Sequence, residues 1–164
     1  MSVSALFPCG TAPRMVPADF LNCGASAAKG YEAACGPVCR QYHLTQTALN
    51  ILLFLANNPG YNTARDICML RGIKTGIASV AVEALMQAGY LVRRRDEADR
   101  RIQRLTLTPA AAPLVAAGRA AQKQFIEAIF QGVSAEECVG FSATLQKVTA
   151  NIRCLSSVSA RKEF

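Results

Sequence analysis

The chain has 164 residues, 51% of them hydrophobic, and its 18 lysines and arginines exceed its 11 acids, giving a formal charge of +7. This length suits one domain with its own core, and the hydrophobic content excludes a disordered chain. Apolar runs such as ILLFLA are too short to span a membrane and no secretory signal is evident, so we expect a soluble, cytoplasmic protein.

The basic residues are concentrated in one part of the chain. Nine of the 18 fall between Arg65 and Arg104, and six of these are arginines within the stretch LVRRRDEADRRIQRLTLT at 91–108. Basicity alone favours a polyanionic partner only weakly, but clustering of this kind is typical of a nucleic-acid-binding surface.

The first 17 residues contain three prolines among small residues and predict a flexible N-terminal arm. The helical pattern begins at Asp19, which can serve as an N-cap, and continues to about Tyr42. Gly36 and Pro37 interrupt it. Because proline removes a helix hydrogen bond and clashes with the preceding turn, we expect a kink or a break there.

A second helix is expected over TQTALNILLFLANN, with Thr45 as its cap. Its leucines and Phe54 recur at the spacing of one helix face, which predicts burial. The residues NPG at 58–60 end it as a turn.

Two shorter helices follow. Thr63, with Asp66 three residues later, suits the start of the helix ARDICMLR. Lys74 or Thr75 opens the next helix, GIASVAVEALMQA, which Gly89 closes. Helix, tight turn and helix have the lengths of a helix-turn-helix unit.

A basic hairpin is expected directly behind this unit. YLVRRR begins with residues that favour a strand, IQRLTLT places Leu105 and Leu107 on one face, and DEADRR between them suits an exposed turn. A hairpin in this place makes the unit a winged helix, and the hairpin is its wing.

The remaining chain predicts two long helices. Thr108 followed by Pro109 is a strong helix start, and that helix should run to about residue 132. Ser134 and Glu137 form a capping box for a last helix through about residue 155. The expected fold is therefore mainly α with a small β-wing, in one domain over residues 18–164.

Three of these segments resemble the MarR family of bacterial transcription regulators: HLTQTALNILLFL, ALMQAGYLVRR and DRRIQRLTLT. The last is the most specific, since it is similar to the family's Asp-x-Arg wing followed by Leu-Thr and a long helix. The resemblance extends over roughly residues 20–155. It implies a homodimer in which residues 18–44 and 109–155 form a shared bundle, while residues 45–108 form the DNA-binding lobe.

The resemblance also implies a function. Each lobe would bind one half of a palindromic operator in double-stranded DNA, and relatives often repress transcription until a small phenolic or lipophilic molecule, or cysteine oxidation, releases them. We expect a regulator of this kind, a repressor, without catalytic activity or cofactor. The alternative is a winged-helix protein-interaction module whose DNA binding is weak or lost.

The wing would supply most of the DNA contacts, because arginines replace the counterions that condense on phosphates. By resemblance, Asp99 steadies the wing and Arg101 enters the minor groove, where a planar guanidinium fits a narrow groove of negative potential. The other candidate contacts in the wing are Arg93, Arg94, Arg95, Arg100 and Arg104. A merely solvated charged hairpin is the alternative.

The recognition helix is less typical of the family. Its inward face is expected to comprise Ala78, Ala81, Val82 and Leu85. On its outward face only Lys74, Thr75 and Ser79 can donate hydrogen bonds to bases. Ile77 and Val80 either contact thymine methyl groups or are partly buried, so direct readout should be modest. Arg65 and Arg71 are candidate phosphate contacts or plain surface residues.

The chain has seven cysteines and one histidine. Cys23 lies close to the place where redox-sensing relatives have a reactive thiol, so it is a sensor candidate, with an inert apolar role as the alternative. Cys35 and Cys39 share a helix face, but two ligands do not make a metal site. His43 has no partner residues for catalysis. Three aromatic residues either line an effector cavity or belong to the core: Tyr31, Tyr42 and Phe54.

Overall fold

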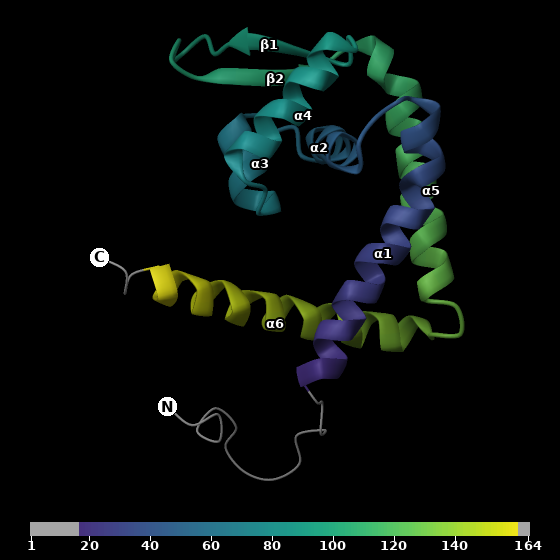
Figure 1. Ribbon diagram of the computed structural model, residues 1–164. Coiled ribbons are helices and arrows are strands. Elements are labelled where there is room, and N and C mark those ends of the chain that lie inside the picture. Colours follow the sequence, from purple (N-terminus) through teal and green to yellow (C-terminus); the bar gives the residue numbers. More distant parts are fainter. Residues whose placement is uncertain (1–16, 161–164) are drawn as a thin grey trace. The chain divides into compact units, whose positions relative to one another are not determined.

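The computed structural model describes residues 17–160, with side chains described for 18–154 (Figure 1). The chain divides into two compact units, residues 1–125 and 126–164. The expected arm at 1–17 lies outside the described residues except for Pro17, which is helical. One domain over residues 18–164 stays a prediction. Within the described residues, no helix is long and apolar enough to pass through a bilayer.

The first unit holds most of the secondary structure. Its elements, in chain order, are α1 (Pro17–Gln41), α2 (Gln46–Asn57), α3 (Ala64–Arg71), α4 (Thr75–Gln87), β1 (Leu91–Arg95) and β2 (Gln103–Leu107). A 3-10 turn (Pro109–Ala111) leads into α5 (Ala112–Ile129), which crosses into the second unit, and α6 (Ala135–Ala160) follows there. The expected fold class, mainly helical with a two-stranded antiparallel wing, is confirmed.

Helix α1 differs from expectation at both of its unusual positions. It begins at Pro17, so Asp19 lies in the first turn and is not the N-cap. A carboxylate there still interacts favourably with the positive end of the helix dipole. The helix also continues through Pro37, so of the expected kink or break, the break does not occur. The lost hydrogen bond is offset because Cys35 and Val38, on either side of the proline, are buried in the core.

The caps of α2 and α3 are as expected. Thr45 accepts a hydrogen bond from the amide of Ala48 at 3.1 Å. Thr63 and Asp66 form a full capping box, in which each side chain accepts the other residue's amide, at 3.1 and 2.9 Å. Gly72 closes α3 with φ 63°, a left-handed conformation that glycine adopts without strain. Gly72 therefore ends α3 where the turn to α4 begins.

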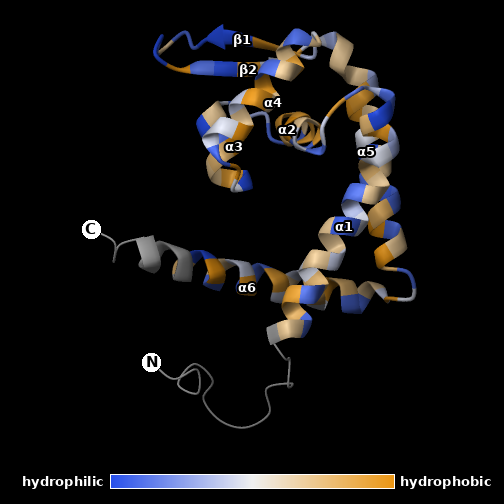
Figure 2. Ribbon diagram, in the orientation of Figure 1, coloured by the Kyte–Doolittle hydropathy of each residue, from blue (hydrophilic) through white to orange (hydrophobic). Residues whose placement is uncertain are grey.

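Helix α2 forms the centre of the core of the first unit. Apolar residues cover most of its circumference (Figure 2), and Leu49, Ile51 and Leu52 are fully buried. A helix of this composition is stable only when neighbours surround it. Its neighbours include the inward face of α4, where the four residues expected from the sequence are buried: Ala78, Ala81, Val82 and Leu85. Leu91, Leu105 and Leu114 also belong to this core.

The base of the wing is closed by Thr108. Strands β1 and β2 pair antiparallel from Leu91↔Leu107 to Arg95↔Gln103. Thr108 stands at the N-cap position, as expected, but its side chain does not cap the helix. Instead, its hydroxyl donates to the carbonyl of Gly89 at 2.6 Å, and its amide donates to the carbonyl of Tyr90 at 3.0 Å. The residue therefore ties the end of the wing to its beginning.

The second unit is built around the start of α6. Ser134 and Glu137 form the expected capping box, with the Ser134 amide donating to the Glu137 carboxylate at 2.8 Å. Phe130 and Phe141 pack edge to face with their ring centroids 5.7 Å apart. Helix α5 ends at Ile129, and α6 runs to Ala160, a few residues from the ends expected from the sequence.

Candidate nucleic-acid interface

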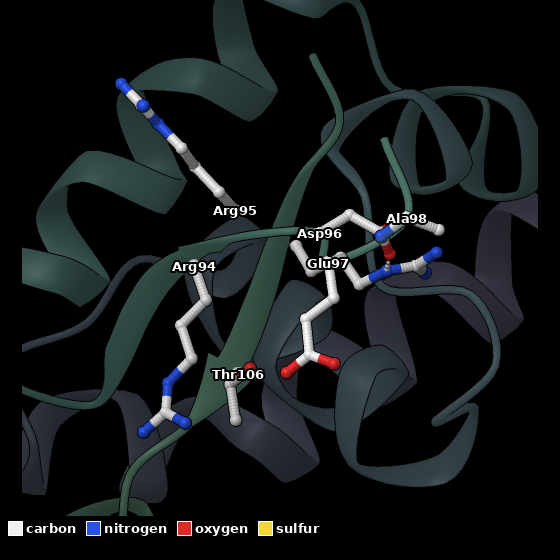
Figure 3. Close-up of a pocket in the computed structure, with 7 residues that line it drawn as sticks. Arg94, Arg95, Asp96, Glu97, Ala98 and Thr106 are labelled. Carbon is white, nitrogen blue, oxygen red and sulfur yellow. Dashed lines mark hydrogen bonds and ion pairs between the residues drawn. The ribbon is translucent and has the colours of Figure 1, made fainter. Parts of the chain in front are cut away.

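The wing displays its cations on both faces. Consecutive residues of a strand point to opposite sides, and Figure 3 shows Arg94 and Arg95 directed apart from β1. The guanidinium groups of four exposed residues form no ion pair with any described residue: Arg93, Arg94, Arg95 and Arg100. Since unpaired surface cations attract counterions that a polyanion can release, this ribbon suits a phosphate backbone on either side.

Asp99 holds Arg101 in a defined orientation. The Nε of Arg101 donates to one carboxylate oxygen of Asp99 at 3.1 Å, and a terminal guanidinium nitrogen donates to the other at 3.1 Å. The backbone amide of Arg101 donates to the first of these oxygens at 3.0 Å. Despite these bonds, the Arg101 side chain is 91% exposed. Hydrogen bonding from Arg101 holds the pKa of Asp99 below its ordinary value, so the pair is ionised at neutral pH. The planar guanidinium of Arg101 therefore points into solvent in a defined orientation.

A second acid, Asp96, organises the turn of the wing. One of its carboxylate oxygens accepts the amides of Ala98 and Asp99, at 3.0 and 2.9 Å. The other accepts from Arg104, in an ion pair. The amide of Asp99, followed by the Arg104 side chain, holds the pKa of Asp96 below its ordinary value. Sequence reasoning missed Asp96, although an acid three residues before Asp99 at the start of a turn is a recognisable signal.

Arg104 connects this turn to the helix-turn-helix unit. Its second nitrogen donates to the side-chain oxygen of Asn62 at 2.9 Å, and the neighbouring amide of Leu105 donates to the Asn62 carbonyl at 2.7 Å. The sequence offered Arg104 as a DNA contact, which stays a prediction. Its geometry gives it another task, because both ends of its guanidinium are engaged within the chain.

The outward face of α4 is as apolar as the sequence indicated. Lys74, Thr75 and Ser79 are exposed at its start. Ile77 is 53% exposed and Val80 is 73% exposed. Neither side chain is part of the core, although Ile77 is only about half exposed, and their contact with thymine methyl groups stays a prediction.

A recess lies between the start of α2 and the turn that joins α3 to α4. It has a volume of about 440 Å³ and is lined by Thr47, Asn50, Arg71, Gly72, Ile73, Lys74 and Ile77. Two cations and two polar side chains meet there, so the structure brings Arg71 and Lys74 to one site. Arg65 is exposed on α3 and does not line this recess.

The cysteines occupy contrasting environments. Cys23 is exposed on α1, but it lies six residues after Pro17, beyond the first turn to which the field of the helix end is confined. Cys35 is buried, and burial raises the pKa of the half-buried Cys39, whose thiol donates to Gln46 at 3.6 Å. Within residues 17–160, no group of three metal-ligating side chains lies together.

The aromatic residues considered for an effector cavity pack on the core. Phe54 is buried in α2, and Tyr42 packs against the same cluster. Tyr31 contacts Phe125 edge to face, with ring centroids 5.6 Å apart, and its hydroxyl accepts a hydrogen bond from Gln122 at 2.9 Å. Their observed role is to join α1 and α5 to the core.

Residues 43–102 match the sequence profile of the MarR family, which confirms the resemblance seen in the sequence. The fold is similar to a MarR transcriptional regulator from Methanosarcina mazei Go1, with 20% identity, a TM-score of 0.72 and coverage of 84% of this chain and 99% of that one. It is also similar to MepR of S. aureus, solved as a complex with DNA (18% identity, TM-score 0.70, coverage 86% and 99%). A third similar structure is BpsR of Bordetella bronchiseptica, described with the regulation of its DNA binding by 6-hydroxynicotinic acid (22% identity, TM-score 0.65, coverage 86% and 98%). Among curated proteins, none matches this sequence.

Proposed function

Residues 43–102 match the model of the MarR family of transcriptional regulators, and on that premise we propose that the protein is a dimeric repressor that binds double-stranded DNA. In this proposal, α4 of each protomer enters a major groove while the wing lies along the adjacent minor groove. Two protomers related by a two-fold axis then match a palindromic operator, with half-sites about one helical turn apart.

The observation that carries the proposal is the Asp99–Arg101 pair. Arg101 is almost fully exposed, yet its guanidinium is oriented by two side-chain hydrogen bonds. An arginine held in advance loses less side-chain entropy when it enters a narrow groove, and it interacts strongly with the negative potential there. A merely solvated hairpin gives no reason for this orientation.

The remaining contacts are to phosphates and to base edges. Arg71 and Lys74 meet in the recess beside the start of α4, where an oxygen of the DNA backbone fits between two cations. Arg65, Thr75 and Ser79 are exposed on the same helix-turn-helix unit and add further donors. In the wing, the cations without an ion pair to a described residue are Arg93, Arg94, Arg95 and Arg100, and Arg104 connects the wing to the helix-turn-helix unit.

Exposed apolar side chains support the dimer. On α1, Phe20 is 43% exposed and Leu21 is 67% exposed. On α6, Val139 is 71% exposed and Phe141 is 53% exposed. Large apolar surfaces of this kind are normally covered in the functional assembly. We propose that α1 and α6 of a second copy of the chain cover these side chains.

Release from DNA is assigned to a small phenolic or lipophilic molecule, or to oxidation of the exposed Cys23. The relative BpsR, whose DNA binding is regulated by 6-hydroxynicotinic acid, supports the first of these signals. Either signal acts mechanically, because a change in the separation of the two α4 helices prevents both half-sites from being occupied together.

A mobility-shift experiment tests the proposal directly. The protein is titrated onto a labelled duplex from the region upstream of its own gene and onto a scrambled duplex of equal length. We expect a discrete complex of two protomers per upstream duplex, with weaker binding to the scrambled one. Failure to shift either duplex would instead favour a winged helix used as a protein-interaction module, for which the apolar exposed face of α4 is the best argument.

A further inference from the structure

The exposed face of α4 has an unusual side-chain distribution for a helix that reads DNA. At 3.6 residues per turn, Val80 lies opposite the buried face formed by Ala78, Val82 and Leu85, and Ile77 lies one turn before it. Val80 therefore projects toward any partner of the helix, together with Gly76 and Glu83, and Ile77 lies at the flank of this outward face. Val80 and Ile77 are both substantially exposed, at 73% and 53%.

Polar side chains surround these two residues without replacing them. Lys74 precedes the helix and, with Arg71, lines the recess that also includes Ile77. The face therefore consists of an apolar strip with cations at its edge, and the cationic wing follows α4 immediately in the chain.

This distribution matches the major groove of DNA. Phosphates form the two rims of the groove, where cations bind, while the floor carries base edges. Glu83, exposed one turn after Val80, disfavours phosphate contact and can accept a hydrogen bond from a base amino group, so this side of the helix faces bases rather than the backbone. The only apolar group that base edges present in the groove is the C5-methyl group of thymine.

We infer that Ile77 and Val80 read thymine C5-methyl groups, and that each half-site is recognised chiefly by where those methyl groups lie. This inference rests on the proposed function, because it requires α4 to enter the major groove. It replaces hydrogen-bond readout by arginine or glutamine with apolar contact, which discriminates less strongly per base.

Deoxyuridine substitution isolates this contact, because uracil keeps every hydrogen-bonding group of thymine and lacks only the methyl. Duplexes are first selected for binding from a random-sequence pool. Each thymine of a selected duplex is then replaced by deoxyuridine, one position at a time. We expect deoxyuridine to weaken binding about fourfold when it replaces thymine at one or two positions of a half-site, because one buried methyl group is lost. The equivalent positions of the other half-site should respond equally, and substitution elsewhere should leave the affinity unchanged.

Variants assign the contact to its residue. The Val80→Ala variant should bind thymine and deoxyuridine equally well at one of the sensitive positions. The Ile77→Ala variant should do so at the other. Met69→Ala is the control, since Met69 is 69% exposed on α3 and its replacement should leave every ratio of affinities unchanged. Because these side chains are exposed, the variants should melt close to the wild-type temperature.

The possible results distinguish failure of the thymine inference from failure of the proposed DNA-binding function. Binding to the selected duplex with no sensitive thymine would overturn the inference and leave the proposed function standing. A Val80→Ala variant that weakens binding but keeps the wild-type ratio at every thymine would also overturn it, since Val80 would then be acting only on structure. If no duplex is selected at all, both statements fail.

Discussion

Arg104 binds the carboxylate of Asp96, which lies eight residues earlier at the start of the wing's turn. The same guanidinium reaches Asn62, in the loop before α3, at 2.9 Å. One side chain therefore joins the turn of the wing, the strand β2 and the helix-turn-helix unit. These contacts of Arg104 hold the wing against the helix-turn-helix unit. The positions of the exposed arginines in the wing therefore depend on Arg104.

Removal of Arg104 should loosen the wing. In Arg104→Ala, Asp96 loses its ion-pair partner. The amides of Ala98 and Asp99, which donate hydrogen bonds to Asp96, should then exchange faster with solvent in hydrogen–deuterium exchange. Arg94→Ala is the matched control, because Arg94 stands opposite Arg104 in the sheet and is exposed without an ion pair to a described residue. We expect Arg94→Ala to weaken DNA binding without faster exchange. Equal exchange in the two variants would show that Arg104 does not position the wing.

The close approach of α5 to α2 predicts opposite effects for the same substitution at two glycines. A Cβ at Gly118 would lie 2.8 and 3.0 Å from the two methyl groups of the buried Leu53. We expect overpacking of about 1–3 kcal/mol to exceed the ~1 kcal/mol gain in helix propensity, so Gly118→Ala should lower the free energy of unfolding.

Gly24 on α1 provides the contrast, since a Cβ there meets nothing within 4 Å. Gly24→Ala should raise the free energy of unfolding by about 0.5–1 kcal/mol. Urea denaturation at one fixed protein concentration measures both, because the stability of the proposed dimer would depend on concentration. Two changes of the same sign would contradict the packing described for Gly118.

The order of the wing should be lost only in acid. Because hydrogen bonds lower the pKa values of Asp96 and Asp99 in the folded chain, their contribution is complete above the ordinary aspartate pKa of about 3.9 and disappears as the pH falls through the lower, folded values. The amide resonances of Asp99 and Arg101 should therefore stay constant from pH 7 to about 5 and shift below about 4. A transition centred near neutral pH would mean that another group controls the wing.

The exposed thiol should react before the half-buried one. Cys23 is accessible on α1, whereas burial raises the pKa of Cys39 and so lowers the fraction of its reactive thiolate. In a time course with iodoacetamide at neutral pH, mass spectrometry should find Cys23 modified before Cys39. Earlier modification of Cys39 would remove Cys23 as the candidate for an oxidative signal.

Local signals in the sequence were sufficient for much of the fold. The capping box at Thr63 and Asp66 involves residues three apart, and the inward face of α4 follows from helical spacing alone. Pro37 was misjudged because burial of its neighbours, which depends on the whole core, outweighs the local penalty. The partner of Arg104 was also out of reach, since Asn62 lies 42 residues away and only the folded chain brings them together.

A salt titration of Arg101→Ala measures whether the wing binds the DNA backbone and minor groove through Arg101. Lys147→Ala, which removes one exposed charge from α6, is the control with the same net charge. For Arg101→Ala we predict weaker binding to every duplex and a plot of log affinity against log salt whose slope is shallower by about 0.9 for each bound protomer, the value for one lost phosphate contact. The control should keep the wild-type slope. An Arg101→Ala variant with wild-type affinity and slope would contradict the account.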